Sequence, residues 1–154
     1  MRTTHIVTAL FLGLSFLGSA CTPAAKLDAP AGFATLKSQG GYDYRAVNAH
    51  GVVVAARTEP NELHGNTAFW ADSLEEKLTR AGYAKESTAD VDTRVGKAKM
   101  QKYAATRDGR DMTYWLLVVS NEKSVVVVEA GGDKETFDKA SKEVESTMKS
   151  VAVN

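Results

Sequence analysis

The segment Thr58–Gly65 gathers residue types that bind metal ions. Glu59, Glu62 and His64 supply two carboxylates and one imidazole, which are common ligands of divalent cations. Their spacing matches no zinc or calcium loop, and a metal site would need further ligands. A polar loop between a strand and a helix is the simpler interpretation. His50 precedes a glycine and is interpreted as a turn residue, so no metal or other cofactor is predicted.

Motifs that carry catalysis are missing from the sequence. No serine stands in a G-x-S-x-G pattern, and no glycine-rich run resembles a phosphate loop or a dinucleotide fingerprint. Gly131-Gly132 could present backbone N–H groups to an anion at the start of a helix, but such a pair more often lets a strand pass into a helix. Nothing pairs two carboxylates across a cleft. The sequence therefore predicts a protein that is not an enzyme.

Cys21 is the only cysteine in the 154-residue chain, and it follows an apolar run. Ile6–Ala20 contains no charged residue, and Arg2 precedes it. As a helix this run would span about 22 Å, which is shorter than the ~30 Å hydrocarbon core of a membrane. A positive start followed by a short apolar stretch predicts a cleaved export signal over residues 1–20.

The segment Leu17–Cys21, with the sequence LGSAC, resembles the lipobox of bacterial lipoproteins. That family most often has leucine three places before the cysteine, where this chain has Gly18. The resemblance implies cleavage before Cys21, attachment of diacylglycerol to its thiol, and acylation of the new amino group by a fatty acid such as palmitate. The residue after the cysteine is Thr22 and not aspartate. By resemblance to enterobacterial lipoproteins, this implies an anchor in the outer membrane, facing the periplasm. A secreted protein with a free thiol is the alternative.

The charge balance limits the classes of partner. The chain has 19 basic and 19 acidic side chains and a formal net charge of zero, whereas nucleic-acid-binding domains are usually strongly basic. A nucleic-acid partner is therefore not predicted. If Cys21 carries lipid, the remaining chain has no thiol for a disulfide, an iron–sulfur cluster or a zinc site.

The chain divides into a lipidated cysteine with a flexible tether, residues 21–41, and a single domain, residues 42–154. Glycine and proline clusters in residues 22–41 are typical of a flexible coil, although Phe33 and Leu36 could dock on the domain. The length of the remainder fits one domain.

Apolar alternation and turn signals predict six strands and two helices in that domain. The first helix begins at Asn66 or Thr67 and ends at Gly82. Asp108-Gly109 predicts a tight hairpin, and the alternation slips at Lys102-Tyr103 as it does at a β-bulge. The predicted strands are Tyr42–Val47, Val52–Arg57, Tyr83–Ala89, a run from Lys97, Tyr114–Val119 and Val125–Val128, and the last helix follows Gly131-Gly132-Asp133.

The element order is ββαββββα. Tyr114–Val119 and Val125–Val128 are almost wholly apolar, so they suit central strands covered on both faces. Each helix has one apolar stripe to supply that cover. The stripes are Trp70, Leu74, Leu78 and Ala81 in the first helix, and Phe137, Ala140, Val144, Met148 and Val151 in the second. The predicted class is α+β, with a mostly antiparallel sheet between two helices in an α/β/α sandwich.

Six basic residues fall within one strand-and-turn region. They are Arg94, Lys97, Lys99, Lys102, Arg107 and Arg110. One interpretation is a contact surface for anionic lipid headgroups or an acidic partner. The simpler interpretation is a solvated strand whose lysines discourage edge-to-edge aggregation. Acidic residues lie between the six in the sequence and reduce the net positive charge of the region.

The segment from Tyr42 to Val151 resembles the PsbP-like (DcrB-like) superfamily. The resemblance rests on the paired early strands, on Arg80–Tyr83 (RAGY) at a helix end, on Asp108-Gly109 followed by YWL, and on the run VVVVEAGG before the last helix. It implies an accessory or binding protein of the bacterial cell envelope with an envelope protein partner, and no functional residue is carried over. A periplasmic carrier of a small ligand or lipid is the alternative, and an envelope hydrolase is less favoured.

Overall fold

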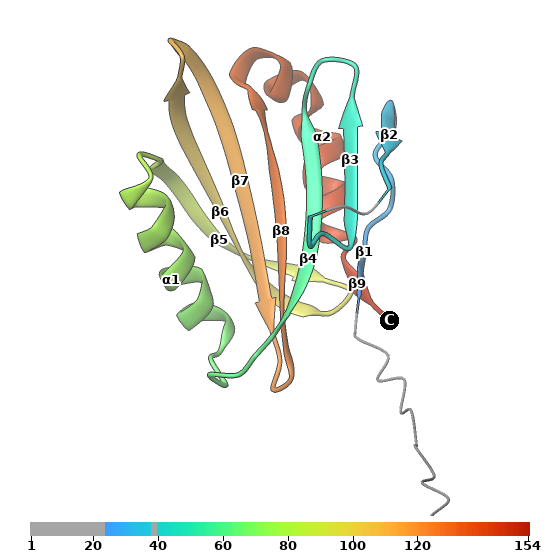
Figure 1. Cartoon of the computed structure of the whole chain (residues 1–154), viewed down its shortest axis with the longest axis vertical. Coiled ribbons are helices and arrows are strands. Elements are labelled where there is room, and N and C mark those ends of the chain that lie inside the picture. Colours follow the sequence, from blue (N-terminus) through green and yellow to red (C-terminus); the bar gives the residue numbers. More distant parts are fainter. Residues whose placement is uncertain (1–23, 38–39) are drawn as a thin grey trace, which may run out of the picture.

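The computed structural model describes residues 24–37 and 40–154, and it confirms the predicted α+β class (Figure 1). Among these residues no helix is both long enough and apolar enough to span a membrane. The elements are β1 (Ala25–Lys26), β2 (Phe33–Thr35), β3 (Tyr44–Asn48), β4 (Val53–Pro60), α1 (Thr67–Arg80), β5 (Ala84–Thr93), β6 (Gly96–Arg107), β7 (Arg110–Ser120), β8 (Ser124–Asp133), α2 (Lys134–Lys149) and β9 (Ala152–Val153).

Seven strands form one antiparallel sheet in the order β2-β3-β4-β8-β7-β6-β5, and β1 pairs with β9 in a separate small ladder. The two apolar runs become β7 and β8, which lie at the centre of the sheet with strands on both sides. Their backbones are fully paired, and their side chains alternate between the two faces. The predicted order ββαββββα therefore holds from β3 to α2.

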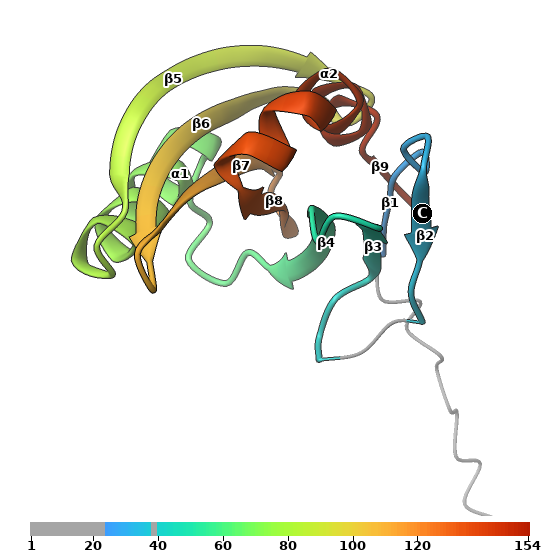
Figure 2. The same cartoon turned by 90° about the horizontal axis from the view of Figure 1, so that it is seen from above.

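The two helices lie on opposite faces of the sheet (Figure 2). α2 buries Phe137, Val144 and Met148 against apolar side chains of β4, β7 and β8. The ring of Trp115 meets that of Phe137 edge to face, with 5.0 Å between the ring centroids. Tyr114 packs on the other side, under α1, as its neighbouring position in the strand requires.

α1 begins and ends where its capping residues predict. Asn66 caps the first turn by accepting a hydrogen bond from the backbone N–H of Phe69 at 2.9 Å. Gly82 adopts φ +88°, and the N–H of Tyr83 donates to the carbonyl of Leu78 at 3.0 Å, which completes a Schellman motif.

The apolar stripe of α1 differs from the prediction at one end. Trp70, Leu74 and Leu78 pack on the sheet as predicted. Ala81 is exposed, whereas Ala71 is buried. Ala81 is the C-cap residue at which the helix ends, so it lies outside the packed stripe.

The hairpin and the bulge show how local signals translate into structure. Asp108 and Gly109 both have positive φ, and Arg107 pairs directly with Arg110, so the predicted two-residue hairpin is confirmed. The predicted bulge lies in the neighbouring strand. β6 keeps a continuous register with β7, and the extra residue is Glu86 of β5, opposite the predicted position. The irregular pattern in one strand thus reflects a bulge in its edge partner.

The N-terminal boundary of the domain corrects the prediction of a tether over residues 21–41. Ala25 and Leu27 are buried in the α2-side core, and β2 extends the sheet beyond β3. The backbone N–H of Ala25 also donates to Asp43 at 2.9 Å. Segment 24–37 therefore belongs to the packed domain, because Ala25 and Leu27 pack into the α2-side core.

Candidate functional site

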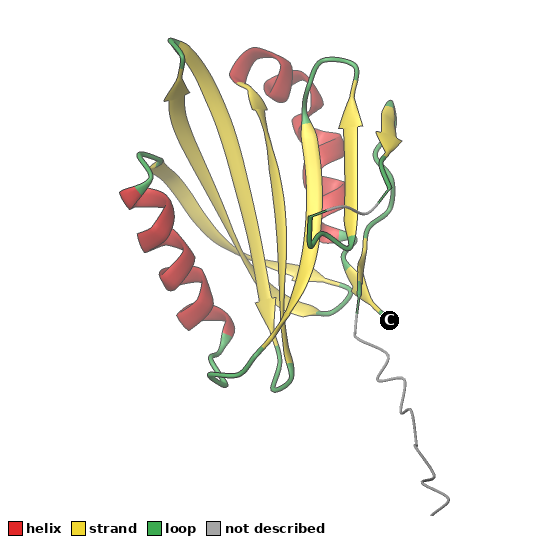
Figure 3. Ribbon diagram, in the orientation of Figure 1, coloured by secondary structure: helices red, strands yellow, loops and turns green. Residues whose placement is uncertain are grey.

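α1 covers only part of its face of the sheet. It packs over β5, β6 and β7 and on Val125 and Val127 at the start of β8, whereas the same face of β3, β4 and the end of β8 lies beyond it. Figure 3 shows α1 beside β5–β7, with α2 behind β3 and β4. We call the uncovered half, formed by the α1-side face of β3, β4 and the end of β8 from Glu129, the open face.

A groove runs along the boundary between α1 and the open face. It has a volume of about 560 Å³, with Trp70, Leu74 and Lys77 of α1 on one side. Arg57 of β4 and Glu129 of β8 stand on the other side. A second hollow of about 290 Å³ continues beyond Glu129, and its lining includes Tyr42, Val53, Ala55, Tyr114 and Gly131. The two hollows share Tyr42 and Glu129 in their linings, so they adjoin each other at these residues.

Glu129 lines both hollows and has polar partners on either side. The hydroxyl of Tyr114 donates to its Oε1 at 2.5 Å, and Arg57 donates to its Oε2. The side chains of Arg57 and Glu129 are 23% and 19% exposed, so water reaches the pair only partly. The guanidinium of Arg57 also lies over the ring of Tyr42, 5.9 Å from its centroid. The cluster Tyr42, Arg57, Tyr114 and Glu129, called here the Glu129 cluster, is the candidate functional site.

The strand register explains why these residues meet. Glu129 lies opposite Ala55 of β4 and Leu116 of β7, so its long side chain has a small neighbour on the β4 side. Tyr114 lies opposite Gly131, which leaves the ring free to lean toward Glu129. A Cβ built on Gly131 would lie 3.4 Å from the Tyr114 ring. A larger residue there would press on the ring.

The environment keeps both phenols of the cluster protonated. Burial, together with the nearby Glu129 carboxylate, raises the pKa of Tyr114. The Glu129 carboxylate, with a further contribution from burial, raises the pKa of Tyr42. A protonated phenol donates a hydrogen bond and stacks, but it is a weak nucleophile. The arrangement therefore suits recognition by hydrogen bonds and aromatic contact.

A second group of aromatic rings holds Tyr114 in place. The ring centroids of Tyr83 and Tyr103 lie 5.2 and 6.3 Å from that of Tyr114. Burial, with a smaller contribution from Glu75, raises the pKa of Tyr103 to about 12. The guanidinium of Arg107 lies over Tyr83, 5.3 Å from the ring centroid. Tyr114 is thus fixed by packing from one side and by Glu129 from the other.

Sequence reasoning missed the Glu129 cluster, although one signal was present. Glu129 is the one charged residue within the apolar run Val125–Gly132. A charge inside a central strand demands a partner. The identity of that partner, Arg57, is fixed only by the pairing of β4 with β8, which sequence does not reveal.

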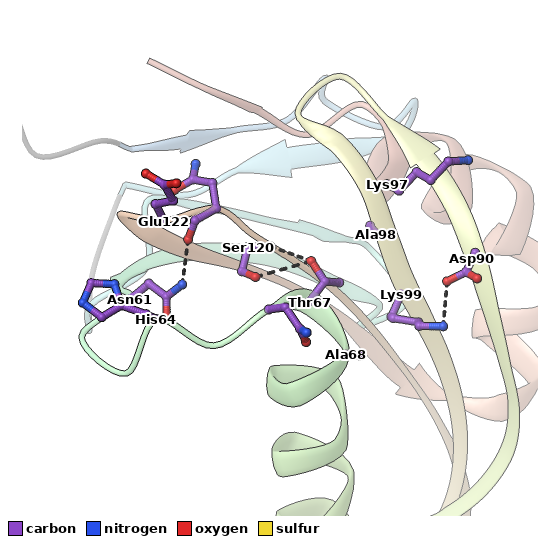
Figure 4. A pocket seen from close by; sticks show the side chains of 12 residues that line it. Asn61, His64, Thr67, Ala68, Asp90, Lys97, Ala98, Lys99, Ser120 and Glu122 are labelled. Carbon is purple, nitrogen blue, oxygen red and sulfur yellow. Dashed lines mark hydrogen bonds and ion pairs between the residues drawn. The ribbon is translucent and has the colours of Figure 1, made fainter.

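A different pocket, shown in Figure 4, lies between the start of α1 and strands β5 and β6. It has a volume of about 540 Å³. Buried Asn61 spans its inner wall, donating to the carbonyls of Asn121 at 2.6 Å and Gly65 at 2.9 Å and accepting from the Trp70 indole at 2.9 Å. These bonds tie the loop before α1 to the turn between β7 and β8. The polar groups of this pocket therefore stabilise the fold.

The three residues considered as metal ligands, Glu59, Glu62 and His64, do not converge. Glu59 pairs with Arg57 at 3.6 Å, Glu62 is exposed, and His64 stands on the rim of the pocket of Figure 4. Within residues 24–37 and 40–154, no three His, Cys, Asp or Glu side chains are grouped to hold a metal ion.

The six basic residues of the predicted contact surface do not form one surface. Lys97 and Lys99 share the α1 side of β6, whereas Lys102 lies on the α2 side over the Trp115 ring, with 3.8 Å from Nζ to the centroid. Arg94 lies at one end of β6, and Arg107 and Arg110 lie at the other. Acidic partners face four of them: Asp28 at 2.5 Å from Arg94, Asp92 at 3.2 Å from Lys97, Asp90 at 2.8 Å from Lys99 and Glu145 at 3.6 Å from Lys102.

The predicted lipidation site, Cys21, lies outside the described residues, so its modification stays a prediction. The same holds for the export signal of residues 1–20.

Comparison with known proteins finds solved structures of similar fold. No protein-family model and no curated protein matches the sequence. Among solved structures, LpqN of Mycobacterium tuberculosis, described as involved in cell envelope biogenesis, is similar with a TM-score of 0.72 at 11% identity. The match covers 90% of this chain and 87% of LpqN. The cyanobacterial PsbP protein of Synechocystis sp. PCC 6803 is similar with a TM-score of 0.56 at 12% identity, covering 93% of this chain and 99% of that protein. The chain has a PsbP-like fold.

Proposed function

We propose that the protein is a lipoprotein of the bacterial cell envelope with a non-catalytic binding or assembly role. Its anchor is a lipid on Cys21, placed in the outer membrane and facing the periplasm. Its binding site is the groove between α1 and the open face. The observation that carries this proposal is the partly exposed Glu129 cluster on a sheet face that α1 leaves half covered.

The Glu129 cluster has the composition of an interaction site. Tyrosine and arginine are the residue types that most often dominate binding energy at protein interfaces. Arg57 and Tyr114 are both held in place by Glu129, so binding them costs little side-chain entropy. Trp70 and Leu74 add apolar area at the edge of the groove.

The setting supports an accessory role in the envelope. The PsbP-like fold is shared with LpqN, which is described as involved in cell envelope biogenesis. The sequence around Cys21 resembles a lipobox. An anchored domain meets membrane partners at a raised local concentration, so a groove of modest area is sufficient for function.

Capture of partners from the native cells tests the proposal. Full-length protein would be crosslinked in the cells and its partners identified by mass spectrometry. Val53 lines the open face opposite Gly131, so Val53→Arg would place a long charged side chain in the second hollow, which adjoins the groove at Tyr42 and Glu129. Ser146→Arg adds the same charge on the exposed surface of α2, and it serves as the matched control.

We expect a defined envelope protein with the wild type and with Ser146→Arg, and its loss with Val53→Arg. Cys21→Ser should also reduce capture, because the variant lacks the anchor. Equal capture by Val53→Arg and wild type would contradict the assignment of the groove.

A periplasmic carrier is the second candidate, because one observation favours it. The groove volume of about 560 Å³ falls within the range of small-molecule sites, and Val125, Val127 and Leu74 supply apolar lining. A small molecule or lipid that co-purifies with the wild type, and not with Val53→Arg, would move this candidate ahead of the assembly role.

A further inference from the structure

We propose that one end of the domain rests directly on the lipid surface, with Leu63 and Phe69 entering the headgroup region. This end, called here the membrane end, comprises β1, the loop between β4 and α1, and the turn between β7 and β8. The inference rests on the proposed lipid anchor at Cys21 and adds the orientation of the domain on the membrane.

The first step is the reach of the chain. Only Thr22 and Pro23 separate Cys21 from Ala24, and three residue steps extend at most about 10 Å. The headgroup region of one leaflet is about 5–8 Å thick. A lipid on Cys21 therefore holds Ala24 within or beside the headgroups.

The second step is that Ala24 is firmly attached to the domain. Its carbonyl accepts a hydrogen bond from the backbone of Asn154 at 3.3 Å, and the next two residues pair with β9. The N–H of Ala25 donates to Asp43, and the N–H of Asp28 donates to Ser150 Oγ, each at 2.9 Å. The chain is bonded to the domain from Ala24 onward, so no flexible linker follows Ala24. The anchor therefore brings the domain itself to the membrane.

The third step is which surface lies there. Figure 1 shows the C-terminus beside β1 toward the lower end of the molecule, together with the β4–α1 loop and the β7–β8 turn. The hairpin between β6 and β7 stands at the upper end. The loop and the turn are joined by hydrogen bonds from the Asn61 backbone to Lys123 at 3.0 Å and from its side chain to Asn121 at 2.6 Å.

The membrane end presents apolar side chains that the domain does not bury. Leu63 is 69% exposed and Phe69 is 45% exposed, and among the described residues the other large apolar side chain with such exposure is Leu36. Phe69 packs on the loop, since a Cβ on Gly65 would lie 2.3 Å from its ring. The loop and the first turn of α1 thus form a firm apolar projection, which a membrane interface would bury.

The charges of this end favour apolar contact over attraction to anionic lipid. Its β1 strand, loop and turn carry two basic and two acidic residues, Lys26, Lys123, Glu62 and Glu122. In the neighbouring turn between β5 and β6, Arg94 is paired with Asp28 and Lys97 with Asp92. Opposite charges that are paired or balanced produce only a weak electrostatic attraction toward distant lipid headgroups. The contact should therefore form on neutral lipid and depend weakly on salt.

A fluorescence depth measurement on lipidated full-length protein in phosphatidylcholine vesicles tests the proposal. Lipidation consumes the thiol of Cys21, which is the only cysteine, so an introduced cysteine takes the label alone. Leu63→Cys places an environment-sensitive dye at the membrane end, and Arg110→Cys places it at the opposite hairpin. Both positions are exposed, so both variants should fold.

We expect spin-labelled lipid to quench the dye at position 63 at least threefold more than the dye at position 110, at low and at high salt. Equal quenching at both positions, with lipid on Cys21 verified by mass spectrometry, would overturn the orientation and leave the anchor intact. Absence of lipid on Cys21 would overturn the orientation and the proposed anchor together. Protection of position 63 by a delipidated envelope extract, and not by vesicles, would assign this end to a protein partner and overturn the proposal.

Discussion

The two faces of the sheet differ in how completely they are covered. On one face, α2 and segment 24–37 enclose a continuous core that includes Leu27, Phe137 and Met148. On the other face, α1 buries fully only Ala71 among its own residues and leaves β3, β4 and the end of β8 open. The first face is built to stabilise the domain, and the second leaves polar and aromatic groups within reach of a partner.

This division has a simple physical basis. Full burial of one large apolar side chain contributes roughly 1.5–3 kcal/mol, and α2 buries Phe137, Val144 and Met148 completely. The side chains by which α1 packs are only partly buried. A domain whose stability comes mainly from one face can keep a partly exposed ion pair on the other.

Phe137→Ala should produce the largest loss of stability. Removing a fully buried phenylalanine costs about 3–5 kcal/mol through lost burial and the cavity left behind, and Phe137 also loses its contact with Trp115. On the α1 side, Leu74→Ala should cost about 1–2 kcal/mol because Leu74 is partly exposed. Urea unfolding of both variants measures the difference. Equal losses would contradict the unequal roles of the two faces.

Leu27→Ala should cost about 2–3 kcal/mol, because Leu27 is buried in the α2-side core. Leu36→Ala, in the same N-terminal segment, should cost less than about 0.5 kcal/mol because Leu36 is exposed. The midpoints of urea unfolding give both values. An unchanged midpoint for Leu27→Ala would mean that segment 24–37 adds nothing to the core.

Glu129→Gln should reduce stability by roughly 1–2 kcal/mol, because Arg57 loses its charged partner in a partly buried place. Glu122→Gln, on an exposed turn, is the control and should change little. The same Glu129 variant should weaken partner capture. If Glu129→Gln left both the stability and the partner capture unchanged, the proposed role of the Glu129 cluster would be contradicted.

Tyr114 should make the stability of the domain sensitive to alkaline pH. Burial and the nearby Glu129 carboxylate raise its pKa in the folded protein above the ordinary tyrosine value of about 10. The stability linked to its protonated form is therefore present below pH 10 and lost as the pH rises toward the raised pKa. Tyr114→Phe should reduce this loss between pH 10 and 11, measured by thermal unfolding. An identical alkaline profile for the variant would contradict the assignment.

Glu145 of α2 should make the stability of the domain depend on pH in the acid range, but to a smaller extent. Lys149 donates to it at 2.5 Å, and this bond lowers the pKa of Glu145 below its usual value. The stability linked to its ionised form is present above pH 4.5 and lost as the pH falls through the lowered pKa. Since the pair is partly exposed, Glu145→Gln should change stability by only a few tenths of a kcal/mol at pH 7. Glu143→Gln is the matched control for urea unfolding at pH 7 and pH 3, and equal behaviour of the two variants would contradict this role.

Local signals account for most of the fold that sequence reasoning predicted. Asp108-Gly109 fixes its hairpin because both residues tolerate positive φ, and Gly82 fixes the end of α1 in the same way. The apolar runs of β7 and β8 identify the central strands, because only strands buried on both faces lack alternation.

Features set by distant contacts could not be predicted. β1 and β9 are two residues long and pair across nearly the whole chain, so neither carries a pattern of its own. The incomplete cover by α1 depends on where the helix lies over the sheet, which its apolar stripe does not specify. The Glu129 cluster depends on the pairing of β4 with β8 and β8 with β7, so its residues meet only in the folded chain.

Site-specific photocrosslinking in living cells tests the central claim most directly. A photoreactive amino acid would replace Val53 on the open face in one sample and Ser146 on the exposed surface of α2 in another. We predict that position 53 captures a defined envelope component and that position 146 captures none. Capture of that component from position 146, with none from position 53, would contradict the account and assign binding to the α2 side.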